Sequence, residues 1–146
     1  MDVYLAGYAD TKWREEFKNT IARDIEISDP FDSKYNEFTS SEKANQIAKE
    51  LENIENCQVV VFYFCPEWDS CYSILQLGDA VGRGKQVTVC LIPGSGTEEK
   101  IRRYCEYRGV LIVSNLEDLV VNTEEYLAQL DILEVANEKK LAKAKR

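Results

Sequence analysis

The run Gln58–Phe64, with the sequence QVVVFYF, constrains the fold of this 146-residue chain more than any other segment. Almost every position carries an apolar or aromatic side chain, so a strand built from it must be buried on both faces. Such strands are typical of parallel sheets that helices cover on both sides. Met1–Gly7 and Gln86–Ile92 are apolar runs of the same kind. The sequence therefore predicts an α/β protein built on a central parallel sheet.

Helical spacing of apolar residues marks the segments that separate these strands. We expect strands at 1–7, 24–28, 58–64, 86–92 and 109–113, and helices at 11–23, 41–54, 73–81, 98–107 and 114–133. This alternation predicts a single doubly wound, flavodoxin- or Rossmann-like sheet of five parallel strands with helices on both faces. We expect one domain over residues 1–135 and a charged, solvated tail over residues 136–146. Ligands of such sheets bind beyond the carboxyl ends of the strands.

Residues 31–40 form a polar and aromatic stretch between the second expected strand and a helix that Ser40 or Ser41 can cap. Long loops of this kind inside a compact domain are often functional. The stretch is therefore a candidate part of a site, although the sequence assigns it no particular role.

The strand-loop-helix unit Phe64–Lys85 (FCPEWDSCYSILQLGDAVGRGK) is a second segment of interest. We expect Asp69 and Ser70 at the carboxyl end of the central strand. Gln76 is expected in the first turn of the following helix, near the positive end of the helix dipole. A carboxylate at that position would stay ionised, whereas an amide can only form hydrogen bonds.

The charge and the residue types narrow the chemistry. The net charge is −8 and the chain has no histidine. An acidic surface repels nucleic acids and anionic membranes, so we expect neither as a partner. The lack of histidine removes Ser-His and Cys-His nucleophile pairs and zinc-histidine sites. We expect no metal and no other cofactor, and any proton transfer must use carboxylates, Tyr, Cys or Lys.

The five cysteines are odd in number and include no CxxC pair. They are expected to be small buried side chains in a reducing compartment rather than a metal site or a redox pair. No signal peptide precedes the first expected strand, and no apolar run approaches 18 residues. We therefore expect a cytoplasmic protein.

Four motifs follow one another along residues 1–115. They are Val3-Tyr4-Leu5-Ala6-Gly7, Glu50-Leu51-x-x-Ile54, the loop with Asp69 or Ser70, and Gln76-Leu77-Gly78-x-Ala80-x-x-x-Gly84-Lys85. Together they resemble the nucleoside 2-deoxyribosyltransferase family and its nucleotide N-glycosidase relatives, in which the last motif reads Glu-Leu-Gly-x-Ala followed by Gly-Lys. Trp13-Arg14 and Tyr72-Ser73 look like one subgroup of that family. In the last motif, the small residues Gly78 and Ala80 are expected to let the helix lie close to the sheet.

The resemblance implies a nucleoside or nucleoside 5′-monophosphate as substrate and chemistry at its N-glycosidic bond. A glutamate of the family attacks the anomeric carbon, and an acceptor base or water then releases the sugar. This chain has Gln76 at the nucleophile position, and an amide is a far poorer nucleophile. Two interpretations stay open: a Glu-to-Gln replacement that traps a ligand, or a natural nucleotide-binding protein without catalysis. A third, a Toll/interleukin-receptor-like signalling domain, rests on fold analogy alone.

The resemblance also implies a set of site residues. The catalytic candidates are Gln76, Asp69 and Tyr4, and the substrate-binding candidates are Gly7, Trp13, Glu50, Trp68, Ser70, Ser73, Tyr104 and Tyr107. Each has a structural alternative: the strand tyrosine and the tryptophans can be core residues, Glu50 a solvated charge, and Asp69 and Ser70 helix caps. Arg83 and Lys85 are expected to be surface charges. Lys12 and Arg14, or Ser70 and Ser73, could hold a phosphate.

We expect a homodimer or a higher homo-oligomer. In the family, a neighbouring subunit completes the pocket from about the region of Tyr104 and Tyr107, which could instead be a surface stripe. The last expected helix carries more apolar residues than one sheet face needs. These are Leu119, Val120, Leu127, Leu130 and Leu133.

Overall fold

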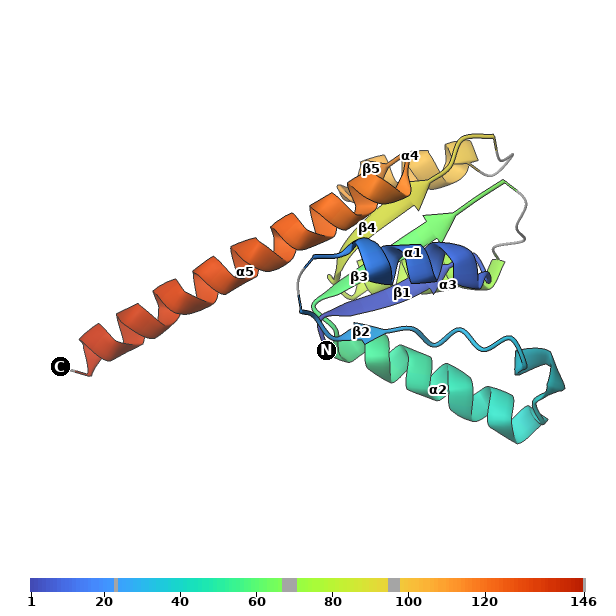
Figure 1. Ribbon diagram of the computed structural model, residues 1–146, viewed down its shortest axis with the longest axis horizontal. Helices are drawn as coiled ribbons and strands as arrows, with labels where there is room; N and C mark the ends of the chain where they lie inside the picture. Colours follow the sequence, from blue (N-terminus) through green and yellow to red (C-terminus); the bar gives the residue numbers. More distant parts are fainter. Residues whose placement is uncertain (23, 67–70, 95–97, 146) are drawn as a thin grey trace.

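The apolar run at residues 58–64 forms the central strand of the sheet, as the sequence predicts. A computed structural model describes residues 1–22, 24–66, 71–94 and 98–145, and within them five parallel strands form one sheet in the order β2-β1-β3-β4-β5 (Figure 1). The strands are β1 (Val3–Gly7), β2 (Ile27–Ser28), β3 (Val59–Phe64), β4 (Gln86–Leu91) and β5 (Leu111–Val113). This order confirms the predicted flavodoxin-like fold.

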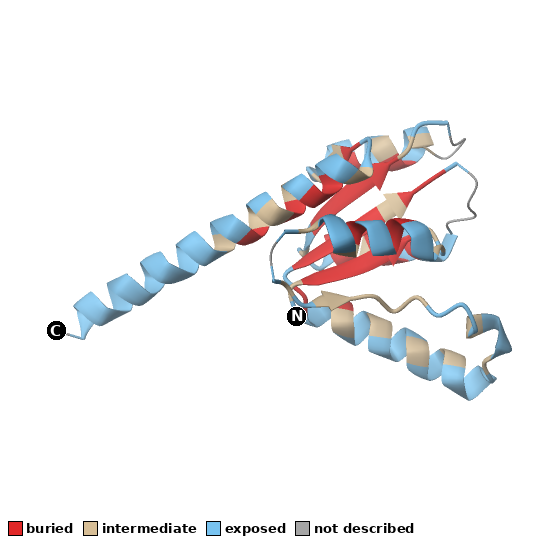
Figure 2. Ribbon diagram, in the orientation of Figure 1, coloured by how far each residue is buried: buried red, intermediate tan, exposed pale blue. Residues whose placement is uncertain are grey.

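Helices cover both faces of the sheet. They are α1 (Thr11–Thr20), α2 (Ser40–Asn56), α3 (Cys71–Gly82), α4 (Glu98–Arg108) and α5 (Leu116–Ala144), and a 3₁₀ helix, η1 (Tyr35–Glu37), lies between β2 and α2. Because side chains alternate along a strand, β1 and β3 supply both cores. Tyr4 and Phe62 face a core that α2, α3 and α4 close, whereas Val3 and Val61 face a core that α1 and α5 close. The strands β1, β3 and β4 are the most deeply buried part of the molecule (Figure 2).

The start of α2 and the length of β2 both differ from the prediction. The helix α2 begins at Ser40, since the hydroxyl of Thr39, rather than that of Ser40 or Ser41, accepts a hydrogen bond from the Glu42 amide at 3.2 Å. The strand β2 is shorter than expected. It comprises Ile27 and Ser28, which pair with the first two residues of β1 at the edge of the sheet.

The helix α3 begins at Cys71, before the predicted start at Ser73. Gln76 therefore lies in its second turn rather than its first, where the helix dipole acts less strongly. The expectation for Gly78 was wrong, because the nearest atom to a Cβ added there is the Tyr104 hydroxyl of α4, at 4.0 Å, and not the sheet. Ala80 does pack fully buried in the core.

The helix α5 continues past its predicted end at Leu133 and runs through the expected tail to Ala144, away from the sheet (Figure 1). The predicted apolar stripe divides accordingly. Leu119, Val120 and Leu127 are buried against the sheet, whereas Leu133 is 59% exposed. Although α5 is 29 residues long, no helix in the described part of the chain is long and apolar enough to cross a membrane.

Candidate functional site

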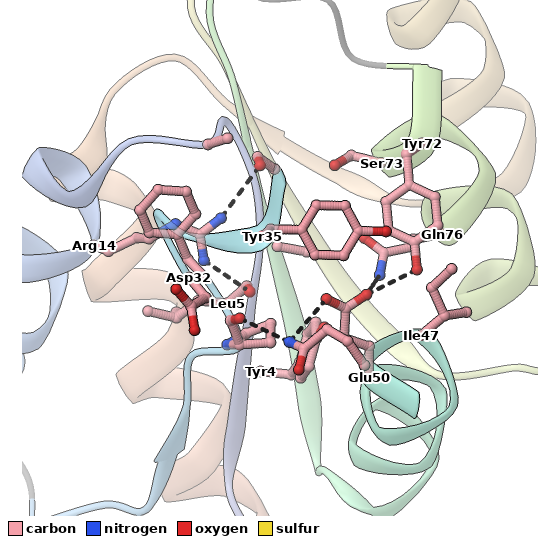
Figure 3. Close-up of a pocket in the computed structure, with 16 residues that line it drawn as sticks. Tyr4, Leu5, Arg14, Asp32, Tyr35, Ile47, Glu50, Tyr72, Ser73 and Gln76 are labelled. Atoms are coloured by element: carbon pink, nitrogen blue, oxygen red, sulfur yellow. Dashed lines mark hydrogen bonds between the residues drawn. The ribbon is translucent and has the colours of Figure 1, made fainter. Parts of the chain in front are cut away.

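A cavity of about 460 Å³ opens at the carboxyl end of β1, on the face of the sheet that α2 and α3 cover (Figure 3). The chain moves outward from β1 to β2 and then returns to place β3 on the other side of β1. Such a reversal of strand order leaves a crevice in which α/β proteins bind ligands. The cavity is lined by Tyr4, Leu5, Ala6, Gly7, Ala9, Arg14, Pro30, Phe31, Asp32, Tyr35, Gln46, Ile47, Glu50, Tyr72, Ser73 and Gln76.

Gly7 ends β1 in a conformation that only glycine adopts without strain. Its φ is +111°, and a Cβ at this position would lie 2.2 Å from the carbonyl oxygen of Tyr63 on β3. The close approach of the two strands is fixed by the Tyr8 amide, which donates to the same carbonyl at 2.8 Å. The floor of the cavity therefore depends on a glycine at position 7.

Arg14 braces this end of β1 from α1. Its Nη1 donates to the carbonyl of Leu5, and its Nη2 donates to the carbonyls of Gly7 and Tyr8, all at 3.2 Å. The residue is only 4% exposed, and its Nε has no hydrogen-bond partner among the described residues. Because protein carbonyls occupy the terminal nitrogens, Arg14 shapes the floor rather than offering an open fork to an anion.

The same guanidinium also holds the segment that follows β2. Its Nη1 lies 2.7 Å from Oδ1 of Asp29, whose Oδ2 lies 2.8 Å from the Lys18 ammonium. Burial acts to raise the pKa of the Asp29 carboxyl, but Lys18 and Arg14 outweigh it and hold that pKa below its usual value. The Asp29 carboxylate is thus an ionised anchor for the cavity wall.

Glu50 lies at the centre of a hydrogen-bonded cluster that joins α2 to α3 (Figure 3). Its Oε2 accepts a hydrogen bond from the Tyr72 hydroxyl at 2.8 Å and a longer one from Nε2 of Gln76 at 3.5 Å. Its Oε1 accepts from Nε2 of Gln46, one helical turn away, at 3.3 Å. The carboxylate is therefore a fixed feature of the cavity and not a freely solvated charge.

Tyr4 presents its hydroxyl to the same region from β1. The residue is fully buried, and its hydroxyl has no partner in hydrogen-bond geometry within the described residues. Burial raises the pKa of Tyr4, and the charge of Glu50 raises it further, while the nearby Gln76 amide offsets part of the effect. Burial and the bond to Glu50 also raise the pKa of Tyr72. Both phenols are therefore hydrogen-bond donors at neutral pH, and that of Tyr4 is available to a ligand.

Five of the residues predicted for the site line this one cavity. They are Tyr4, Gly7, Glu50, Ser73 and Gln76, of which Gln76 is only 6% exposed. Trp68, Asp69 and Ser70 lie outside the described residues.

Three other predicted residues lie elsewhere in this single chain. Trp13 is buried, stacks on Tyr63 with ring centroids 4.9 Å apart and donates from Nε1 to the Tyr8 carbonyl at 2.8 Å, so it packs beneath the site instead of lining it. Tyr104 lines a second, apolar cavity of about 360 Å³ between α3 and α4. Tyr107 is 88% exposed on α4.

Several lining residues were not predicted. One is Gln46. It lies four residues before Glu50 on the same face of α2, and this spacing could have suggested it. The polar and aromatic content of residues 31–40 was a signal for Phe31, Asp32 and Tyr35, whereas Pro30 and Ile47 lie outside that stretch. No group of three or more His, Cys, Asp or Glu side chains that could hold a metal ion occurs in the described ranges.

Comparison with known proteins bears on what this cavity is. Among curated proteins, no sequence matches the chain. A family model described as "Nucleoside 2-deoxyribosyltransferase like" matches residues 1–94. That range contains β1 to β4 and every residue that lines the cavity. The chain therefore belongs to the nucleoside 2-deoxyribosyltransferase-like family.

Proposed function

We propose that the chain binds a nucleoside or nucleoside 5′-monophosphate in the cavity at the end of β1, and that Gln76 suppresses cleavage or transfer at its N-glycosidic bond. The observation that supports the proposal most directly is the position of Gln76 in the cavity lining. This residue, which matches the family's nucleophile in sequence, is buried in the cavity wall between the hydroxyl of Tyr4 and the carboxylate of Glu50.

The arrangement suits a sugar whose anomeric carbon faces position 76. A glutamate there would attack that carbon, the bond to the base would break with its electron pair leaving on the base, and the sugar would be held as a glycosyl ester. Water or a second base would then release it. Tyr4 and Ser73 can donate hydrogen bonds to sugar hydroxyls, and Glu50 can accept one.

One observation favours binding without turnover as the state of the chain as it stands. The Gln76 amide donates to Glu50, so it belongs to the hydrogen-bonded cluster of the resting site. Because glutamine and glutamate have the same shape, the cavity retains its form while the nucleophile is lost. A non-catalytic nucleotide-binding protein is therefore the second candidate function.

Base release distinguishes the two candidates. The chain and its Gln76→Glu variant would be incubated with deoxynucleosides and deoxynucleoside 5′-monophosphates, with chromatography for free base and calorimetry for binding. We expect both proteins to bind and the variant to release base. Binding by both with release by neither would support the non-catalytic protein. If the unmodified chain turned over at an ordinary enzyme rate, the nucleophile would lie elsewhere, and Asp69 would be tested first.

We also propose that the chain forms a homodimer or higher homo-oligomer. Beyond the sheet, α5 exposes apolar side chains, including Ile132 at 69% and Leu133 at 59%. Burial of this face against a second copy would remove them from water. Light scattering of the full chain is expected to give at least twice the monomer mass, and a monomer at micromolar concentration would contradict the proposal.

A further inference from the structure

The segment that joins β2 to α2, residues 29–38, forms one wall of the cavity and is named the strap here. Pro30, Phe31, Asp32 and Tyr35 of the strap all line the cavity. Figure 3 shows Tyr35 facing the same space as Glu50 and Gln76. The strap overlaps the polar and aromatic stretch 31–40, to which the sequence assigns no particular role, and the proposed chemistry at position 76 does not use it.

Two contacts fix the strap in place. At its start, Asp29 is bound by Arg14 and Lys18, at 2.7 and 2.8 Å. One residue later, the carbonyl of Pro30 accepts a hydrogen bond from Nε2 of Gln46 on α2, at 3.0 Å. The strap is therefore a shaped wall that both α1 and α2 support.

The aromatic rings of the strap are held as well. The guanidinium carbon of Arg14 lies 5.2 Å from the centre of the Phe31 ring. Tyr35 begins η1, packs edge-on against Phe38 with ring centroids 5.7 Å apart, and has the Lys43 ammonium 5.4 Å from its ring centre. Rings that are already ordered lose little conformational freedom when a ligand stacks on them.

The cavity lining combines two kinds of side chain. Pro30, Phe31, Tyr35 and Ile47 supply aromatic and aliphatic surface, and Tyr4, Glu50, Tyr72, Ser73 and Gln76 supply hydroxyl, carboxylate and amide groups. A nucleoside likewise combines a flat aromatic base with a hydroxylated sugar. With the anomeric carbon at position 76, the sugar can hydrogen-bond to the polar groups beside that residue, and the rings of the strap offer the base a surface on which to stack.

We propose that Phe31 and Tyr35 form the base-binding subsite and hold the nucleobase by stacking. This inference rests on the proposed function, because it takes the orientation of the sugar from position 76. Trp13, one of the two tryptophans predicted to bind substrate, is packed on Tyr63 outside the cavity lining, and the other, Trp68, lies outside the described residues. The Tyr72 hydroxyl donates a hydrogen bond to Glu50, so Tyr72 belongs to the polar cluster beside Gln76.

The test compares paired variants of the full chain by calorimetry with three probes: a deoxynucleoside, its free base and 2-deoxyribose. Tyr35→Leu removes the ring, and Tyr35→Phe keeps it and serves as the matched control. We expect Tyr35→Leu to weaken binding of the deoxynucleoside and the base by about 5- to 150-fold, the range that loss of a stacked aromatic produces. Binding of the sugar should be unchanged, and Tyr35→Phe should retain the affinity of the unmodified chain.

Phe31→Leu is the second variant, and it should show the same selective loss. If Tyr35→Leu and Phe31→Leu both bound the deoxynucleoside as tightly as the unmodified chain, the subsite would be overturned while the proposed function stood. Loss of sugar and base binding together would also overturn it, because the rings would then only support the cavity. If the unmodified chain bound no nucleoside or nucleotide, the proposed function itself would fail.

Discussion

Nε2 of Gln76 on α3 lies 3.5 Å from Oε2 of Glu50 on α2, so the residue that we propose stands at the nucleophile position is hydrogen-bonded to a carboxylate on another helix. An amide can donate to an ionised carboxylate, whereas a carboxylate in its place would set two like charges side by side. Glutamine at position 76 therefore adds a hydrogen bond to the cluster around Glu50, whereas glutamate would place a second negative charge beside it. This relationship bears on how a Gln76→Glu variant should behave.

The Gln76→Glu variant should gain base release by several powers of ten over the unmodified chain. An amide provides no covalent path through a glycosyl ester, and each 1.4 kcal/mol of barrier is worth about tenfold in rate. Single-turnover chromatography on a deoxynucleoside measures the gain. Gln76→Asn is the control, since it keeps an amide and should stay inactive. Equal rates for Gln76→Glu and Gln76→Asn would contradict the assignment of position 76.

The pH profile of Gln76→Glu should have an acidic limb that lies above the usual glutamate pKa of about 4.3. Position 76 is only 6% exposed and adjoins Glu50, and both burial and a neighbouring negative charge raise a carboxyl pKa. Since the nucleophile must be ionised, activity is lost as the pH falls through this raised value. Rates between pH 4 and pH 9 locate the limb. In the double variant that adds Glu50→Gln the limb should move to lower pH, and an unmoved limb would refute the coupling.

Gly7→Ala should destabilise the chain by about 2–4 kcal/mol, because the added Cβ would meet backbone atoms of Tyr63 at 2.2 Å and the φ of +111° is unfavourable for alanine. Urea unfolding measures the change. Gly84→Ala is the matched control: its φ is +75°, but no atom lies within 4 Å of the added Cβ. That control should cost about 1–2 kcal/mol, from backbone strain alone. Equal costs would mean that contact with Tyr63 does not matter.

Arg14→Met should cost about 3–5 kcal/mol in the free energy of unfolding, since it leaves three carbonyls and a largely buried Asp29 carboxylate without this partner. Arg14→Lys should not restore the stability, because a single ammonium group cannot make the hydrogen bonds that the two terminal nitrogens of the guanidinium make.

The pH dependence of stability gives a second measure of the Arg14→Met change. The lowered pKa of Asp29 contributes stability that is present above its unfolded value of about 3.9 and is lost as the pH falls through the lower folded value. Arg14→Met should make this acid loss smaller. An unchanged acid profile would show that Lys18 alone sets the pKa of Asp29.

The sheet could be predicted because residues 58–64 are apolar on both faces, which leaves a central parallel strand as the simplest solution. The expectation that Tyr4 and Gln76 share a cavity came from the family resemblance together with that topology, and both residues line the cavity. The start of α3 was misplaced because its first turn includes exposed residues such as Tyr72 that add nothing to the apolar periodicity. The helix α5 is longer than predicted. The charge of residues 138–146 suggested a solvated tail, but the Lys, Leu and Ala residues in this segment favour a helix.

Part of the cavity wall could not be predicted from sequence patterns. A tryptophan that stacks on a ligand and one that packs on Tyr63 look the same in a sequence, so the role of Trp13 was open until its neighbours were known. The strap lines the cavity because Asp29 forms an ion pair with Arg14. These residues are 15 positions apart, so the local hydrophobic pattern gives no indication that they pair.

That pairing also has a kinetic consequence. Because Arg14 binds both the carbonyls of β1 and the carboxylate of Asp29, the end of β1 and the start of the strap form one mechanical unit. A hinge motion of the strap at Asp29 would break the hydrogen bonds and the ion pair of Arg14, so we do not expect a nucleoside bound as proposed above to leave by that route. We expect the exit to open farther along, around Tyr35, so that dissociation rates respond to changes near η1 and hydrogen exchange is slower at Phe31, next to the anchor, than at Tyr35.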